Sequence, residues 1–176
     1  LPIFYNQVMG IETLVIEAWT PDSSISPSQI ALAHLAVRQN QEHEGTNIFS
    51  DITDTQADLV GLEQNYIASG GNFFTARAED GQLKGFIGLR NHGDGCGELK
   101  RLAVLPEFEG LGIGRALVAK LIDWARENEF TRITLETGGD EHARTRIYEK
   151  VGFVITGVAP KEDKTDGWLM EFDLKR

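Results

Sequence analysis

A glycine-rich turn between an apolar segment and an amphipathic segment constrains the fold of this chain more than any other feature. Residues 102–105 are apolar, Pro106 ends that segment, and three glycines fall at alternate positions over 110–114. Apolar residues then recur at helical spacing over 115–125. Glycines let the backbone approach a ligand closely, and a helix start offers unpaired N–H groups and the positive end of the helix dipole. The pattern predicts a cradle for a phosphate-bearing ligand; the alternative is a tight turn that binds nothing.

Length and composition indicate one globular domain. The 176 residues lie within the usual size of a domain, about 100 to 200 residues. Shares of 41% hydrophobic and 25% charged residues are typical of a soluble protein and exclude a disordered or collagen-like chain. No apolar run approaches the roughly 20 residues that span a bilayer, so we expect no membrane partner. The single cysteine, Cys96, cannot form an internal disulfide, which favours a reducing compartment, the cytoplasm.

The first residues are set apart from the domain. Residues 1–10 have no charged n-region, and their apolar stretch is too short and interrupted for a signal peptide. Met9 is a candidate natural start. We therefore interpret residues 1–10 as a leader or disordered segment and expect the domain over 11–176.

Charge is distributed unevenly along the chain, whose formal net charge is −10. Residues 1–97 hold 4 Lys and Arg against 12 Asp and Glu, whereas residues 98–126 hold 5 against 4. The segment with the glycine turn is thus not acidic, which suits a phosphate ligand there. The overall acidity disfavours nucleic acid as a partner, because the phosphate backbone needs a basic face. The acidic first half favours a cationic second ligand, unless it serves only solubility.

Hydrophobic periodicity and turn residues predict an alternation of strands and helices. Strands are expected over 13–19, 73–78, 83–89, 96–105, 131–136, 153–158 and 168–174, and helices over 28–43, 55–69, 111–128 and 141–151. The turn at 79–82 joins two of these strands as a hairpin. This mixture predicts an α+β or mixed α/β sheet in a single domain.

Two segments together carry a family resemblance. The glycine turn matches neither the Rossmann fingerprint nor the P-loop, because Leu117 stands where a third Rossmann glycine belongs and no lysine with a hydroxyl neighbour follows Gly114. Instead, Glu109-Gly-Leu-Gly-Ile-Gly114 and Tyr148-Glu-Lys-Val-Gly-Phe153 resemble the two signatures of the GCN5-related N-acetyltransferase (GNAT) superfamily. The predicted order of elements from 12 to 174 is similar to that of the superfamily, so the resemblance covers nearly the whole chain.

The resemblance implies a fold and an activity. The fold would be a single-domain GNAT-like α+β fold, with a mostly antiparallel twisted sheet of about seven strands flanked by about four helices. The activity would be transfer of an acetyl group from acetyl-CoA, a co-substrate, to an amine of a small molecule or peptide, with no metal. A homodimer is compatible with the resemblance.

The resemblance also implies which residues bind acetyl-CoA. Backbone N–H groups of the glycine turn would hold the diphosphate, and the strand before it would pair with the pantetheine arm, with the Val104 N–H polarising the thioester carbonyl. Glu109 stands where the superfamily usually has Gln or Arg, and a carboxylate there would repel a diphosphate unless it points away. The expected binding residues are Leu102, Ala103, Val104, Glu109, Gly110, Leu111, Gly112, Ile113, Gly114 and Arg115.

Acyl transfer to an amine needs a base for the ammonium and an acid for the departing thiolate, because a free alkyl amine is mostly protonated at neutral pH. Tyr148 resembles the superfamily tyrosine that protonates the thiolate; the alternative is a tyrosine that only packs. Glu98 is the candidate general base, directly or through water, and the alternative is an exposed strand carboxylate. Cys96 has no identified base partner, and the four histidines show no metal-ligand spacing.

Three functions remain open from the sequence. The leading one is an acyl-CoA-dependent N-acetyltransferase that acts by direct attack in a ternary complex on a primary amine of a small, cationic acceptor. The second is a non-catalytic acyl-CoA-binding sensor or interaction module. The third is a nucleotide-binding domain of other chemistry, which ATP or NAD would protect from heat better than coenzyme A does.

Overall fold

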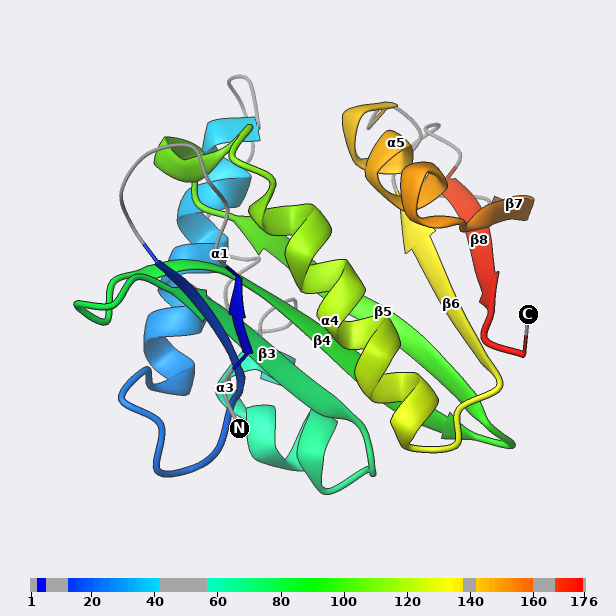
Figure 1. Ribbon diagram of the computed structural model, residues 1–176, viewed down its shortest axis with the longest axis horizontal. Helices are drawn as coiled ribbons and strands as arrows, with labels where there is room; N and C mark the ends of the chain where they lie inside the picture. Colours follow the sequence, from blue (N-terminus) through cyan, green and yellow to red (C-terminus); the bar gives the residue numbers. More distant parts are fainter. Residues whose placement is uncertain (1–2, 6–12, 42–56, 138–141, 160–166, 176) are drawn as a thin grey trace.

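The chain folds around one eight-stranded sheet with helices on both faces (Figure 1). The computed structural model describes residues 3–5, 13–41, 57–137, 142–159 and 167–175. The strand order is β1-β2-β3-β4-β5-β6-β8-β7. The strands are β1 (Ile3–Tyr5), β2 (Leu14–Ala18), β3 (Asn72–Arg77), β4 (Leu83–Gly93), β5 (Cys96–Val104), β6 (Arg132–Thr137), β7 (Val154–Ala159) and β8 (Gly167–Asp173). The predicted α+β class is confirmed.

One parallel contact divides the otherwise antiparallel sheet. Strands β1 to β5 pair antiparallel in sequence order, and β6, β8 and β7 form a second antiparallel group. Only β5 and β6 run parallel, and they pair over three residues, from Cys96 opposite Arg132 to Glu98 opposite Thr134. Beyond these pairs the two strands diverge, as the green and yellow ribbons of Figure 1 show.

Helices form a layer on each face of the sheet. On one face, α1 (Pro27–Gln41), α3 (Ala57–Val60) and the π-helix η1 (Glu63–Ile67) cover a buried cluster that includes Phe73, Phe86 and Ala103. On the other face, α4 (Ile113–Glu127) and α5 (His142–Val151) cover a second cluster. Because successive strand residues point to opposite faces, neighbours such as Phe73 and Phe74 enter different clusters.

Helix α4 lies along the sheet because its apolar residues recur at helical spacing. Its buried positions are Ile113, Gly114, Leu117, Val118, Leu121, Ile122 and Ala125, which confirms the face predicted from the sequence. In Figure 1 the helix lies across β3, β4 and β5. A short 3-10 turn, η2 (Pro106–Phe108), connects β5 to the loop before α4.

Three local features differ from the sequence prediction. The helix expected over 55–69 is two short pieces, α3 and η1, and the hydrogen bond from Ala68 N–H to the Glu63 carbonyl spans five residues, which makes the second piece a π-helix. Residues 3–5, set aside as leader, pair with β2 as an added edge strand, which brings the sheet to eight strands. Strand β4 extends to Gly93 because Asp94 and Gly95 adopt positive φ and close a tight hairpin.

The ends of the other predicted elements that fall on described residues are confirmed within one or two residues. Residues 42–43, the expected end of the first helix, lie outside the described residues, as do residues 55–56 at the expected start of the second helix and residue 141. Across the described ranges, no helix is both long and apolar enough to cross a membrane.

Candidate active site

The divergence of β5 and β6 leaves an open strand edge in the middle of the sheet. Glu98 is the last β5 residue that pairs with β6, whereas β5 continues to Val104. Strand β6 continues to Thr137 but pairs there with β8. Among the described residues, the β6-facing edge of β5 over 99–104 therefore has no strand partner. An edge of this kind can pair with an extended ligand through main-chain hydrogen bonds.

The predicted glycine turn lies at the end of this edge. Gly110 and Gly112 have φ of 76° and 81°, a region that residues with a Cβ adopt only with strain. The first hydrogen bond inside α4 runs from Ala116 N–H to the Gly112 carbonyl, so the N–H groups of Ile113 and Gly114 have no partner within the helix. The N-cap residue is Gly112, which has no side chain to cap the helix. The geometry fits an anion at the helix start.

Strand β5, helix α4 and helix α5 meet beside the turn. A Cβ built on Gly114 would lie 3.5 Å from Val104 Cγ2 and 3.7 Å from Ile147 Cδ1. The next residue on α5, Tyr148, is buried and packs edge-on against Phe153 at a centroid distance of 5.7 Å. The fold thus places the turn and the open β5 edge together, with α5 directly beside them.

The side chains of the predicted binding residues differ in burial. Leu102 and Val104 pack against the α4 side, and Ala103 is buried on the α1 side, so these apolar side chains belong to the core while their main chain forms the open edge. Arg115 is exposed on the first turn of α4. Glu109 is also exposed, and water screens its carboxylate charge.

Glu98 lies at the apex of the opening, on the face that carries α1. Its Oε1 lies 2.8 Å from Lys100 Nζ and its Oε2 lies 2.8 Å from His92 Nε2. Burial raises the pKa of Glu98, but the hydrogen bonds from Lys100 and His92 and their charges more than offset burial and hold that pKa below its usual value. Glu98 is therefore ionised at neutral pH and can accept a proton only weakly.

A buried polar cluster on the same face was missed by the sequence analysis. Asp58 of α3 accepts hydrogen bonds from Arg101 Nη2 at 2.7 Å and Nε at 3.0 Å, and from the Tyr66 hydroxyl at 2.7 Å. Arg90 Nη2 approaches the same carboxylate at 3.5 Å, and His34 Nε2 lies 3.5 Å from Arg101 Nη1. The sequence offered one signal for this cluster: Asp58 directly precedes Leu59 in a predicted helix, and an aspartate is unusual beside the apolar face of a helix.

Arg101 also marks an irregularity in β5. Its φ is +58°, and the register with β4 shifts from Phe86 opposite Ala103 to Gly88 opposite Lys100, which is a β-bulge. Burial raises the pKa of Asp58, yet the hydrogen bonds of Arg101 and Tyr66 and the charges of the two arginines lower it overall. The ionised Asp58 thus holds the Arg101 side chain at the bulge.

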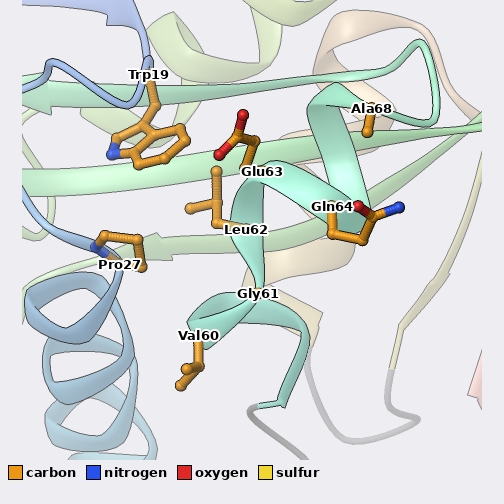
Figure 2. Close-up of a pocket in the computed structure, with 8 residues that line it drawn as sticks. All are labelled: Trp19, Pro27, Val60, Gly61, Leu62, Glu63, Gln64 and Ala68. Carbon is orange, nitrogen blue, oxygen red and sulfur yellow. The ribbon is translucent and has the colours of Figure 1, made fainter.

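A cavity of about 350 Å³ lies elsewhere in the α1 layer (Figure 2). Its lining comes from the end of β2, the start of α1 and the α3–η1 segment, and includes Trp19, Pro27 and Glu63. The Trp19 indole N–H donates to the Ile25 carbonyl at 2.8 Å, which fixes that wall. None of the predicted site residues lines this cavity, so it is separate from the candidate active site. Within the described ranges, no three His, Cys, Asp or Glu side chains are grouped to hold a metal.

Comparison with known proteins identifies the family that this fold and site define. A model of the acetyltransferase (GNAT) family matches residues 30–153. The chain belongs to this family. Its fold also matches a GNAT-family acetyltransferase from Staphylococcus aureus Mu50, with a TM-score of 0.74 and 22% identity, over 92% of this chain and 99% of that one.

Two curated relatives share sequence over somewhat more than half of this chain. The probable N-acetyltransferase camello of Xenopus tropicalis is 34% identical over 98 residues, which cover 54% of this chain and 45% of that protein. The human N-acetylaspartate synthetase is 32% identical over 103 residues, which cover 58% of this chain and 34% of that protein. The chain thus spans less than half the length of these relatives.

Proposed function

We propose that the protein is an acetyl-CoA-dependent N-acetyltransferase that transfers the acetyl group to a primary amine of a small acceptor, by direct attack in a ternary complex. The cytoplasm, which the single cysteine favours, is the proposed location. The observation that carries the proposal is the open β5 edge that leads from the α4 turn to Glu98, in a chain that belongs to the GNAT family.

The donor would lie along this edge. The N–H groups at the start of α4 and the exposed Arg115 would hold its diphosphate. The main chain of Leu102–Val104 would pair with its pantetheine arm, and the Val104 N–H would polarise the thioester carbonyl. Bound acetyl-CoA supplies an activated acetyl group on a thiol that leaves readily.

Two side chains would move protons around that group. The acceptor amine must lose a proton before its nitrogen attacks, and Glu98 would receive that proton. Glu98 lies several residues before Val104 on β5, so a relay through waters fits better than direct contact. As the carbon–sulfur bond breaks, Tyr148 would give its hydroxyl proton to the thiolate.

A thiol-release assay with acetyl-CoA and a panel of primary amines tests the proposal. We expect amine-dependent release of free thiol together with an N-acetylated product in a mass spectrum. Binding of coenzyme A without release for any amine would support the non-catalytic sensor instead. Protection from heat by ATP or NAD, but not by coenzyme A, would contradict a coenzyme A site altogether.

A further inference from the structure

Arg90 presents a positive charge directly beside the candidate base. It lies opposite Glu98 in the β4–β5 register, and directly opposed residues of antiparallel strands share a face with their Cα atoms about 5 Å apart. That face is the α1 side, because Arg90 stacks over the Tyr66 ring at 5.3 Å. The two side chains therefore present opposite charges side by side at the apex of the opening.

The guanidinium of Arg90 keeps donors to spare. The Asp58 carboxylate already accepts hydrogen bonds from Tyr66 and from two nitrogens of Arg101. Arg90 Nη2 approaches this carboxylate only to 3.5 Å, the longest of these four distances to Asp58. The Arg90 side chain is 30% exposed to solvent. A guanidinium carries five N–H donors in a fixed fork that matches a carboxylate, so with respect to the described residues most of this fork is free to meet a ligand.

We propose that the acceptor is an α-amino acid or a similar small amine that carries a carboxylate. Arg90 binds the carboxylate, and Glu98 receives the amine proton through water. This inference rests on the proposed acetyltransferase function and names the substrate class of that same site. It differs from the cationic acceptor that the chain's overall charge favours, because charges more than about 10 Å away are largely screened at physiological salt.

The local charges agree with this class. Arg90, Lys100 and Arg101 face Asp58 and Glu98, which leaves one positive charge in excess before the two histidines are counted. In the reaction the amine nitrogen forms a bond to the acetyl carbon and the carbon–sulfur bond breaks. The ammonium group loses two protons in all: one passes toward Glu98 before the attack, and the second, released as the amide forms, restores the Tyr148 hydroxyl that has protonated the thiolate. The carboxylate on Arg90 is unchanged.

Matched acceptors and matched variants test the inference. Thiol release would be measured with α-amino acids and with the corresponding α-amino amides, which keep the amine and lose the negative charge. For Arg90→Gln we expect KM for the amino acids to rise about 30-fold with kcat nearly unchanged, and KM for the amides to stay the same. Arg90→Lys should restore part of the loss.

Arg126→Gln is the matched control, because Arg126 also stacks on an aromatic ring, Phe172 at 5.6 Å, but belongs to α4. It should leave all constants unchanged, and coenzyme A should protect each variant from heat as it does the wild type. A wild-type enzyme that prefers amides or polyamines, or equal losses for both substrate classes in Arg90→Gln, overturns the inference and leaves the acetyltransferase proposal intact. No thiol release with any amine refutes both.

Discussion

Two acidic side chains on one face of the sheet, Asp58 and Glu98, have different surroundings and therefore different proposed roles. Asp58 is one-tenth exposed and held by Arg101 and Tyr66, so its role is to fix other side chains. Glu98 is twice as exposed, at 20%, and lies at the apex of the opening between Lys100 and His92. Both have lowered pKa values, but only Glu98 lies where an acceptor amine would arrive.

Replacement of Glu98 by Gln tests its proposed role as the base. Because the pKa of Glu98 lies below its usual 4.5, the carboxylate is fully ionised above about pH 5.5, and any acidic limb in that range belongs to another group. We expect kcat to fall about 100-fold between about pH 5.5 and 8 with the shape of the pH profile retained. An unchanged kcat would exclude Glu98 from proton transfer.

Tyr148→Phe separates chemistry from packing. The ring contact with Phe153 is retained, so the free energy of unfolding should change by no more than about 1 kcal/mol. The acid for the thiolate is lost, so kcat should fall about 100-fold while the affinity for coenzyme A stays within a factor of about two. Single-turnover kinetics and calorimetric titration measure the two effects. Full turnover in this variant would assign Tyr148 to the core alone.

At the scale of elements, two devices shape the opening. The start of α4 depends on a left-handed glycine at its N-cap, and β5 carries a bulge at Arg101 that α3 holds through Asp58. Both a strained turn and a buried ion pair cost folding free energy. One variant tests the contribution of the turn to coenzyme A binding, and another tests the contribution of the ion pair to stability.

Gly112→Val should abolish the protection from heat that coenzyme A gives to the wild type. A β-branched residue is strained at φ 81° and crowds the N–H groups that the diphosphate needs. Gly81→Val is the control, because Gly81 has a similar φ of 93° and open space around it but lies in the β3–β4 turn. Both variants should lose stability, and only Gly81→Val should keep the melting shift. A wild-type shift in Gly112→Val would refute the anion cradle.

Asp58→Asn should lower the free energy of unfolding at pH 7 by about 3 kcal/mol, because Arg101 then loses its buried counter-charge. The folded-state pKa of Asp58 is depressed, so its stabilisation is present above the unfolded value near 3.8 and is lost as the pH falls through the lower folded value. The wild type and the variant should therefore converge in urea titrations below about pH 4. A gap that stays constant as the pH falls from 7 through the acid range would show that the charge of Asp58 is not what stabilises.

At the scale of the whole molecule, the pairing order of the sheet creates the site. Strand β6 pairs with β8 along six residues and with β5 along three, so the second strand group turns away from the first. Helix α4 contacts the first group and α5, and its start lies beside the Val104 end of β5. This leaves the β6-facing edge of β5 over 99–104 open for the extended donor that we propose.

Local patterns were enough to predict most of this architecture. Proline and glycine at 106–114 and the apolar spacing over 115–125 predicted the turn and the buried face of α4, because both depend on neighbours in the sequence. The strands followed from alternation and from the hairpin turn at 79–82 for the same reason.

The polar cluster could not be predicted because it depends on long-range contacts. Asp58 and Arg101 are 43 residues apart, and neither has a local motif that indicates the other. The bulge at Arg101 and the pairing of Arg90 with Glu98 likewise depend on the register of two strands, which periodicity alone does not specify. Glu98 and Tyr148 came from the family resemblance, and their roles stay predictions.

A crystal structure of the protein with bound acetyl-CoA tests the central claim most directly. We expect diphosphate oxygens within about 3 Å of the N–H groups at the start of α4, and a pantetheine arm that pairs with the main chain of Leu102–Val104. A donor bound elsewhere on the protein, with no contact to the turn at 110–115, would contradict it.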